Sequence, residues 1–190
     1  MSEQTLSFKV CIIGNEKVGK TSLVKRLLFD TYSEPVEAFE DIAVSKKVTY
    51  MGKEVTLIFY DPLDNGMSTT ASFYNEAHLL VAVFSLNTKD SLENCKYWLS
   101  YGERYITRKY LKVLVGLEAD CTDRLYKKED GEAQGNAMMC KYFEVSAKTG
   151  DGAKEFMDGI LNMLFVENHL IGTQSEKPKK DGKKGKCLLL

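Results

Sequence analysis

Eight residues near the start of the chain have the types and the spacing needed to bind a phosphate group. Residues 14–21 read Gly-Asn-Glu-Lys-Val-Gly-Lys-Thr and match the pattern G-x-x-x-x-G-K-[S/T]. Glycines let the backbone N–H groups of such a loop surround phosphate oxygens, Lys20 adds a positive charge, and the Thr21 hydroxyl is a suitable Mg²⁺ ligand. The sequence therefore predicts a polyphosphate site formed by Gly14, Asn15, Glu16, Lys17, Val18, Gly19, Lys20, Thr21 and Ser22.

Two elements must position this loop, a strand before it and a helix after it. Residues 8–13 form a short apolar run that ends at Gly14, and Leu23, Val24, Leu27 and Leu28 recur at helical spacing. The pattern acts as a phosphate loop in this strand–loop–helix context. An ordinary glycine-rich turn that opens a helix is the weaker interpretation.

The rest of the chain alternates strand-like and helix-like segments. Strands are expected over residues 42–51, 54–60, 79–86, 111–117 and 142–145, and amphipathic helices around Leu92, Cys95 and Leu99 and around Phe156, Ile160, Met163 and Leu164. This order predicts a doubly wound α/β fold, with a mostly parallel six-stranded sheet and helices on both faces. We expect one domain over residues 1–171 and a polar tail over residues 172–190 that lacks the apolar residues needed to fold.

Charge and cysteine usage limit the classes of partner and compartment. The net charge is −1, but six lysines against Glu176 and Asp181 give the tail +4 and leave −5 on the rest of the chain. The tail therefore suits an anionic surface, either lipid headgroups or nucleic acid.

Five cysteines without C-x-x-C spacing indicate neither a disulfide framework nor a zinc site, so a reducing intracellular compartment is expected.

The last four residues, Cys187-Leu188-Leu189-Leu190, fit the lipidation box C-a-a-X with leucine last, the form usually geranylgeranylated. A lipid on Cys187 together with the lysines predicts anchoring to the cytoplasmic face of a plasma membrane or endomembrane, with a cytosolic pool and no nucleic-acid partner. The alternative is a solvated lysine tail that ends in a cysteine by chance. No signal core or membrane-spanning run is visible before the C-terminus.

Three further elements carry a family resemblance. Ser146-Ala147-Lys148 resembles the base-binding S-A-K of Ras-type GTPases, Asp61 follows a strand where that family keeps a water-mediated Mg²⁺ ligand, and Tyr32 matches the aromatic residue packed on guanine. Residues 8–170 thus resemble a Ras superfamily small GTPase. Some motifs are Rab-like, and the single prenylation-type cysteine is Ras-like or Rho-like. The resemblance implies a P-loop NTPase fold, GTP or GDP with Mg²⁺, protein effectors and regulators, and a membrane-anchored switch in signalling or vesicle traffic.

The base-specifying element of this family is half kept. Family members have N-K-x-D where this chain has Leu117-Glu118-Ala119-Asp120. Asp120 can accept two hydrogen bonds from guanine N–H groups that adenine does not offer. Leu117 loses an amide that braces the phosphate loop and Glu118 replaces a lysine that covers the base, so we predict weaker nucleotide affinity than the family norm. Alternatively, Leu117 is only the last core residue of its strand and Asp120 a turn former.

Both switch segments depart from the pattern of an efficient GTPase. Phe39 stands at the spacing where the resemblance predicts an Mg²⁺-binding threonine. Asp64 and Asn65 replace the glycine and glutamine of D-x-x-G-Q, in a segment about two residues shorter than in Ras. Lys20 and Asn65 are the candidate catalytic residues, and we expect slow GTP hydrolysis.

A pseudo-GTPase that acts as a binding or scaffold module is the alternative function. A small ATP-dependent P-loop kinase is disfavoured by Asp120, the S-A-K element and the tail.

Overall fold

Six strands form one sheet in the computed structural model, which describes residues 6–61 and 70–168. They are β1 (Leu6–Ile13), β2 (Ala43–Tyr50), β3 (Lys53–Tyr60), β4 (Leu79–Ser85), β5 (Leu111–Leu117) and β6 (Lys141–Val145). Their order across the sheet is β2-β3-β1-β4-β5-β6. Only β2 runs antiparallel to its neighbour, β3. The predicted mostly parallel six-stranded sheet is thus confirmed.

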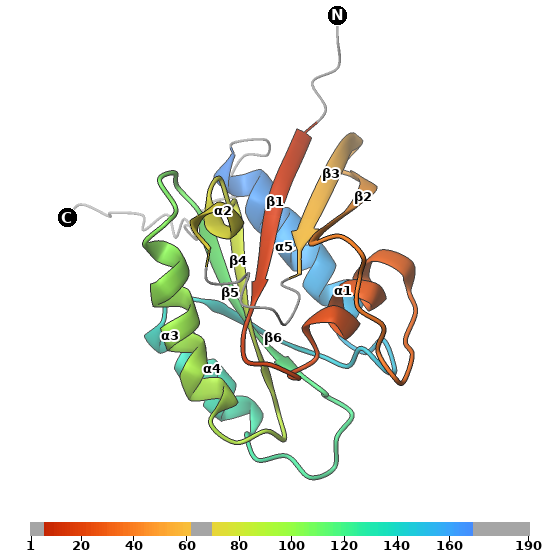
Figure 1. Ribbon diagram of the computed structural model, residues 1–190, viewed down its shortest axis with the longest axis vertical. Coiled ribbons are helices and arrows are strands. Elements are labelled where there is room, and N and C mark those ends of the chain that lie inside the picture. Colours follow the sequence, from red (N-terminus) through yellow and green to blue (C-terminus); the bar gives the residue numbers. More distant parts are fainter. Residues whose placement is uncertain (1–5, 62–69, 169–190) are drawn as a thin grey trace, which may run out of the picture.

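Helices cover both faces of the sheet (Figure 1). They are α1 (Lys20–Phe29), α2 (Ala71–Tyr74), α3 (Ser91–Glu103), α4 (Lys128–Ala137) and α5 (Ala153–Glu167). Figure 1 shows α1 and α5 on one side, and α2, α3 and α4 on the other. This arrangement confirms the doubly wound architecture.

Alternation along the central strand β1 separates the two cores. Phe8, Val10 and Ile12 belong to the apolar cluster that α1 and α5 complete. Cys11 and Ile13 point into the second cluster, which α2 and α3 complete. Because every second residue of a strand faces the same side, both faces of β1 are buried, as a central parallel strand requires.

Two helices were not predicted from the sequence. α4 has the polar sequence Lys-Glu-Asp-Gly-Glu-Ala-Gln-Gly-Asn-Ala, and its buried residues are Gly131 and Gly135. A Cβ atom at Gly131 would lie 2.2 Å from Cζ of Tyr142, so the helix approaches β6 closely only because this residue has no side chain. The other is α2, which has only four residues.

Cys11, Cys95, Cys121 and Cys140 are all free thiols, three of them buried. This agrees with the expectation that these cysteines form no disulfide framework. None of the helices within residues 6–61 and 70–168 combines the length and the apolar character needed to cross a bilayer.

Candidate functional site

The loop between β1 and α1 is held tightly against the sheet. Gly14 (φ 153°) and Gly19 (φ 98°) have backbone conformations that side chains disfavour. A Cβ atom at Gly14 would lie 2.3 Å from the carbonyl oxygen of Val83 in β4, and one at Gly19 would lie 3.3 Å from Cδ1 of Leu117 in β5. The glycines therefore let the loop approach the ends of two strands, which places the N-terminus of α1 at the edge of the sheet. Exposed backbone N–H groups at a helix N-terminus attract anions.

Lys20 is buried at this helix N-terminus, with 7% of its surface exposed. Its Nζ donates hydrogen bonds to the carbonyl oxygens of Asn15, at 2.7 Å, and Gly14, at 3.4 Å. The Asn15 side chain in turn accepts a hydrogen bond from the indole N–H of Trp98 in α3, at 2.8 Å. The loop is therefore curled around the ammonium group and fastened to α3, a pre-formed setting for an anion.

A pocket of about 370 Å³ opens beside this loop. Its lining comprises Lys17, Gly19, Lys20, Thr21, Ser22, Tyr32, Glu34, Val36, Ala38 and Glu118. The lysines and the start of α1 make one side of it suited to phosphate oxygens. Glu34 and Glu118 add negative charge on other sides.

Thr21 and Asp61 are the residues that suit a magnesium ion. Thr21 lines the pocket, whereas Asp61 follows β3, is 3% exposed, and lines neither this pocket nor the one described next. Within the described part of the chain, no group of three or more His, Cys, Asp or Glu side chains could hold a metal by itself. One hydroxyl and one carboxylate fit Mg²⁺, since this ion commonly takes few protein ligands and completes its shell with phosphate and water oxygens.

A second pocket of about 210 Å³ continues from the first. The two share Gly19, Ser22, Tyr32, Glu34 and Glu118, and the second adds Asn87, Leu117, Asp120, Cys121, Ala147 and Lys148. The shared lining makes one extended recess, with the phosphate loop at one end and Asp120 at the other. Its parts come from the loops after β1, β4, β5 and β6, the edge of a parallel sheet where ligands bind.

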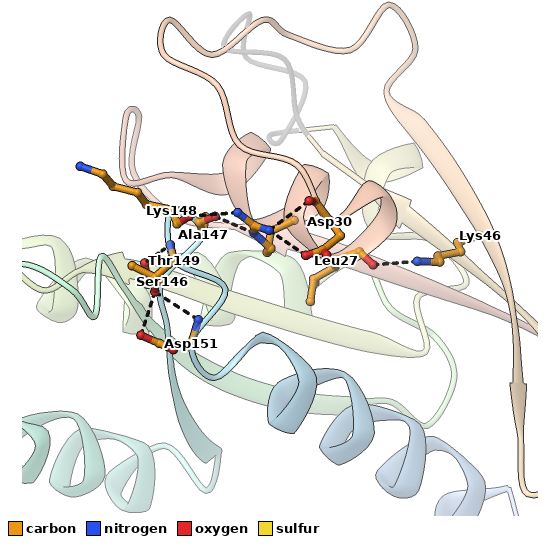
Figure 2. Close-up of polar contacts among 9 residues, drawn as sticks. Leu27, Asp30, Lys46, Ser146, Ala147, Lys148, Thr149 and Asp151 are labelled. Carbon is orange, nitrogen blue, oxygen red and sulfur yellow. Dashed lines mark hydrogen bonds and ion pairs between the residues drawn. The ribbon is translucent and has the colours of Figure 1, made fainter.

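The Asp120 carboxylate is oriented by a hydrogen bond from the Ser146 side chain. Oγ of the fully buried Ser146 donates a hydrogen bond of 2.6 Å to Oδ1 of Asp120 and accepts one of 3.0 Å from the backbone N–H of Thr149. Figure 2 shows the loop of Ser146, Ala147 and Lys148 beside the end of α1. The predicted base-reading residues from two distant segments are thus brought together, with a carboxylate available for N–H donors.

Tyr32 forms a wall of both pockets, and its hydroxyl donates a short hydrogen bond to Oε1 of Glu34. This hydrogen bond and desolvation raise the pKa of Tyr32 to about 12, because both favour the protonated hydroxyl. Desolvation also raises the pKa of the Cys121 thiol at the same recess.

The two residues that depart from the N-K-x-D pattern have separate roles. The Leu117 side chain is 2% exposed and belongs to the core, and a Cβ atom at Gly19 would lie 3.3 Å from its Cδ1, so an apolar group lies next to the phosphate loop where the family pattern has an amide. Glu118 adopts a left-handed backbone conformation (φ 64°), and its carboxylate accepts a short hydrogen bond from Oγ of Ser85. A negative charge therefore lies in the wall common to both pockets.

Not every predicted site residue faces the recess. The Val18 side chain is fully buried in the core, so only its backbone can serve a ligand, and Glu16 is exposed. Asn65 and Cys187 lie outside the described residues. Sequence reasoning missed Trp98, Ser85 and Arg26, which support the recess from other elements.

Comparison with known proteins places these observations in a family context. A model of the Ras family matches residues 9–165. Ras-related protein Rab-26 is 32% identical over 154 residues both in Drosophila melanogaster (78% of this chain, 40% of the relative) and in Mus musculus (76% and 58%). GTP-binding protein YPT1 of Saccharomyces cerevisiae is 31% identical over 152 residues, covering 77% of this chain and 73% of the relative. The matched segment thus spans only about half the length of the two Rab-26 proteins.

Proposed function

This chain belongs to the Ras family of small GTPases and is Rab-like, and from that premise we propose that it is a guanine-nucleotide switch in vesicle traffic or signalling. One observation carries the proposal: a single recess has the buried Lys20 at one end and the oriented Asp120 at the other. GTP and GDP join a polyphosphate to a base with N–H donors, so they match both ends. Protein effectors and regulators are the partners that such a switch requires.

Each part of the recess has a proposed task. The ammonium of Lys20 and the N–H groups at the start of α1 neutralise and orient the phosphates. Asp120 accepts hydrogen bonds from guanine, while Tyr32, Ala147 and Lys148 enclose the base. Thr21, and Asp61 through water, would hold Mg²⁺, which would neutralise charge on the outer phosphates.

We expect nucleotide affinity to be lower than in an ordinary Ras-family protein. Glu34, Glu118 and Asp120 line the base pocket, against one positive side chain there, Lys148. Each carboxylate repels the nucleotide phosphates, and Asp120 alone offsets this by hydrogen bonding to the base. Glu118 also places a carboxylate where the family pattern has a base-covering lysine.

Identification of the nucleotide carried by the purified protein tests the proposal directly. Protein from cells is denatured, and the released small molecules are separated by chromatography and identified by mass. We expect guanine nucleotides in excess over adenine nucleotides, although adenine nucleotides are more abundant in cells. Protein that is folded but carries no nucleotide, and takes up none in millimolar magnesium, would refute the assignment.

Hydrolysis is proposed to be slow. Phe39 packs against Phe29 at the end of α1, with ring centroids 6.3 Å apart, where the family pattern requires a hydroxyl near the outer phosphate. An aromatic ring cannot supply that ligand, and Asn65 is shorter than the glutamine that positions water. In single-turnover phosphate release, we expect the rate to be roughly tenfold or more below that of an ordinary Ras protein measured alongside. A rate at or above the Ras rate would contradict this.

The position of Phe39 also favours a second candidate function, a pseudo-GTPase. Such a module binds nucleotide without hydrolysing it and signals through its partners or its abundance. The same single-turnover assay separates the two candidates, because a pseudo-GTPase releases no phosphate above the rate of free GTP.

We further propose that residues 1–171 form the nucleotide-binding domain and that residues 172–190 anchor it to membranes. A single lipid on Cys187 binds a bilayer only marginally, and six lysines add on the order of 1 kcal/mol each near an anionic leaflet. This places the protein on the cytoplasmic face of a membrane, with a cytosolic pool. Mass spectrometry of protein from native cells should find Cys187 prenylated, and an unmodified Cys187 would overturn the anchor.

A further inference from the structure

Arg26 joins the C-terminal end of α1 to the loop that carries Ala147 and Lys148. Its side chain is only 12% exposed. Nε donates a 2.7 Å hydrogen bond to the carbonyl oxygen of Ala147, and one terminal nitrogen donates a 3.0 Å bond to that of Lys148. The other terminal nitrogen donates to the carbonyl oxygen and to Oδ1 of Asp30, at 3.0 and 2.7 Å. Figure 2 shows these partners together.

The partners of Arg26 lead to two walls of the base pocket. Ala147 and Lys148 line that pocket themselves. Asp30 ends α1 in a left-handed conformation (φ 56°) and begins the segment that carries Tyr32 two residues later. Tyr32 also lines this pocket. Arg26 lines neither pocket, so it acts on the base only through these segments.

The loop that Arg26 holds also orients the residue that reads the base. Ser146 precedes Ala147 and donates its hydroxyl to Asp120 at 2.6 Å. A shift of the 146–148 backbone therefore moves the donor that aims the Asp120 carboxylate. Arg26 fixes this backbone on one side, and the Thr149 N–H fixes the Ser146 hydroxyl on the other at 3.0 Å.

We propose that Arg26 is a positioning residue that sets guanine selectivity and nucleotide residence time. Its hydrogen bonds fix the position of the 146–148 loop relative to the start of the segment that carries Tyr32. The role requires the planar fork of a guanidinium, which presents several donors in a fixed geometry that the single ammonium of lysine cannot reproduce. The inference rests on the proposed guanine-nucleotide function.

The test compares Arg26→Lys and Arg26→Gln with the matched control Lys46→Gln. Lys46 in β2 donates a 3.2 Å hydrogen bond to the carbonyl oxygen of Leu27, so it also binds the end of α1, and the structure gives it no contact with the 146–148 loop. The full-length protein is loaded with GDP or with inosine diphosphate, which lacks the 2-amino group of guanine. Dissociation rates and affinities are measured for both nucleotides.

We expect both Arg26 variants to release GDP about tenfold faster, the equivalent of one charge-assisted hydrogen bond, and to lose about threefold or more of the preference for GDP over inosine diphosphate. Lys46→Gln should stay within about twofold of the wild type in both measurements. Arg26→Lys decides the question if Arg26→Gln does not fold.

Two results would overturn the role of Arg26. One is unchanged GDP release and unchanged selectivity in Arg26→Lys. The other is equal weakening of both nucleotides together with a lower melting temperature, which indicates general destabilisation. A wild-type protein that binds neither nucleotide would instead refute the proposed function, so failure of the premise can be told apart from failure of the inference.

Discussion

Replacing Lys20 with alanine should lower the affinity for GDP and GTP by two to nearly four orders of magnitude, which corresponds to about 3–5 kcal/mol for loss of one partner of a buried charged contact. The ammonium group is almost fully buried, and loop carbonyls already hold it at the phosphate end of the recess. Without it, the phosphates lose a buried cation, and the backbone N–H groups, the exposed Lys17 and the magnesium ion remain. Isothermal titration calorimetry with each nucleotide in excess magnesium measures the change.

Lys17→Ala is the matched control for this prediction. Lys17 lies in the same loop, lines the same pocket and carries the same charge, but its side chain is exposed. Because exposed charges interact weakly in water, we expect its loss to cost less than about tenfold in affinity. Circular dichroism melting must show that Lys20→Ala is folded. Equal nucleotide affinity of folded Lys20→Ala and the wild type would contradict the assigned phosphate site.

Changing Asp120 to asparagine should reverse the base preference from guanine to xanthine. The Asp120 carboxylate only accepts hydrogen bonds, as guanine N1–H and its 2-amino group require. Asparagine offers one acceptor and one donor, which matches xanthine, where an oxygen replaces the amino group. We expect GDP affinity to fall by about 2–4 kcal/mol, while xanthosine diphosphate becomes the tighter ligand. Competition binding of the two nucleotides gives the ratio directly.

The structure makes Asp120→Asn a conservative change for the fold. Oγ of Ser146 can still donate to Oδ1 at position 120, so the loop keeps its geometry. Asp123→Asn is the control, since it makes the same chemical change at an exposed position three residues further along the same loop. If GDP remained the preferred ligand of Asp120→Asn, the carboxylate would not be the group that reads the base.

Local patterns in the sequence were sufficient to predict the strands and the strand–loop–helix unit around residues 14–21. Residues 111–117 were expected as a strand and form β5, and the apolar run after Glu54 falls within β3. Leu92, Cys95 and Leu99 were expected on one helical face, and all three are buried in α3. These predictions succeeded because periodicity within one segment determines which side is buried.

The features that were missed depend on contacts between distant segments. α4 buries two glycines against Tyr142, a packing that hydrophobic periodicity does not reveal. The hydrogen bond from Ser85 to Glu118 could be predicted only if β4 and β5 were known to be neighbours. The contacts of Arg26 with Ala147 and Lys148 join residues more than a hundred positions apart in the sequence. The roles of Asn65 and Cys187 stay predictions from the sequence.

The indole of Trp98 gives the protein a natural optical reporter. It is the only tryptophan of the chain, and its N–H is bonded to Asn15, whose carbonyl oxygen also binds Lys20. Indole emission changes in colour and intensity when its hydrogen bonding and polar surroundings change. A ligand that draws Lys20 away from Asn15 alters those surroundings. The intrinsic fluorescence of unlabelled protein therefore reports the binding of a ligand at this loop in real time.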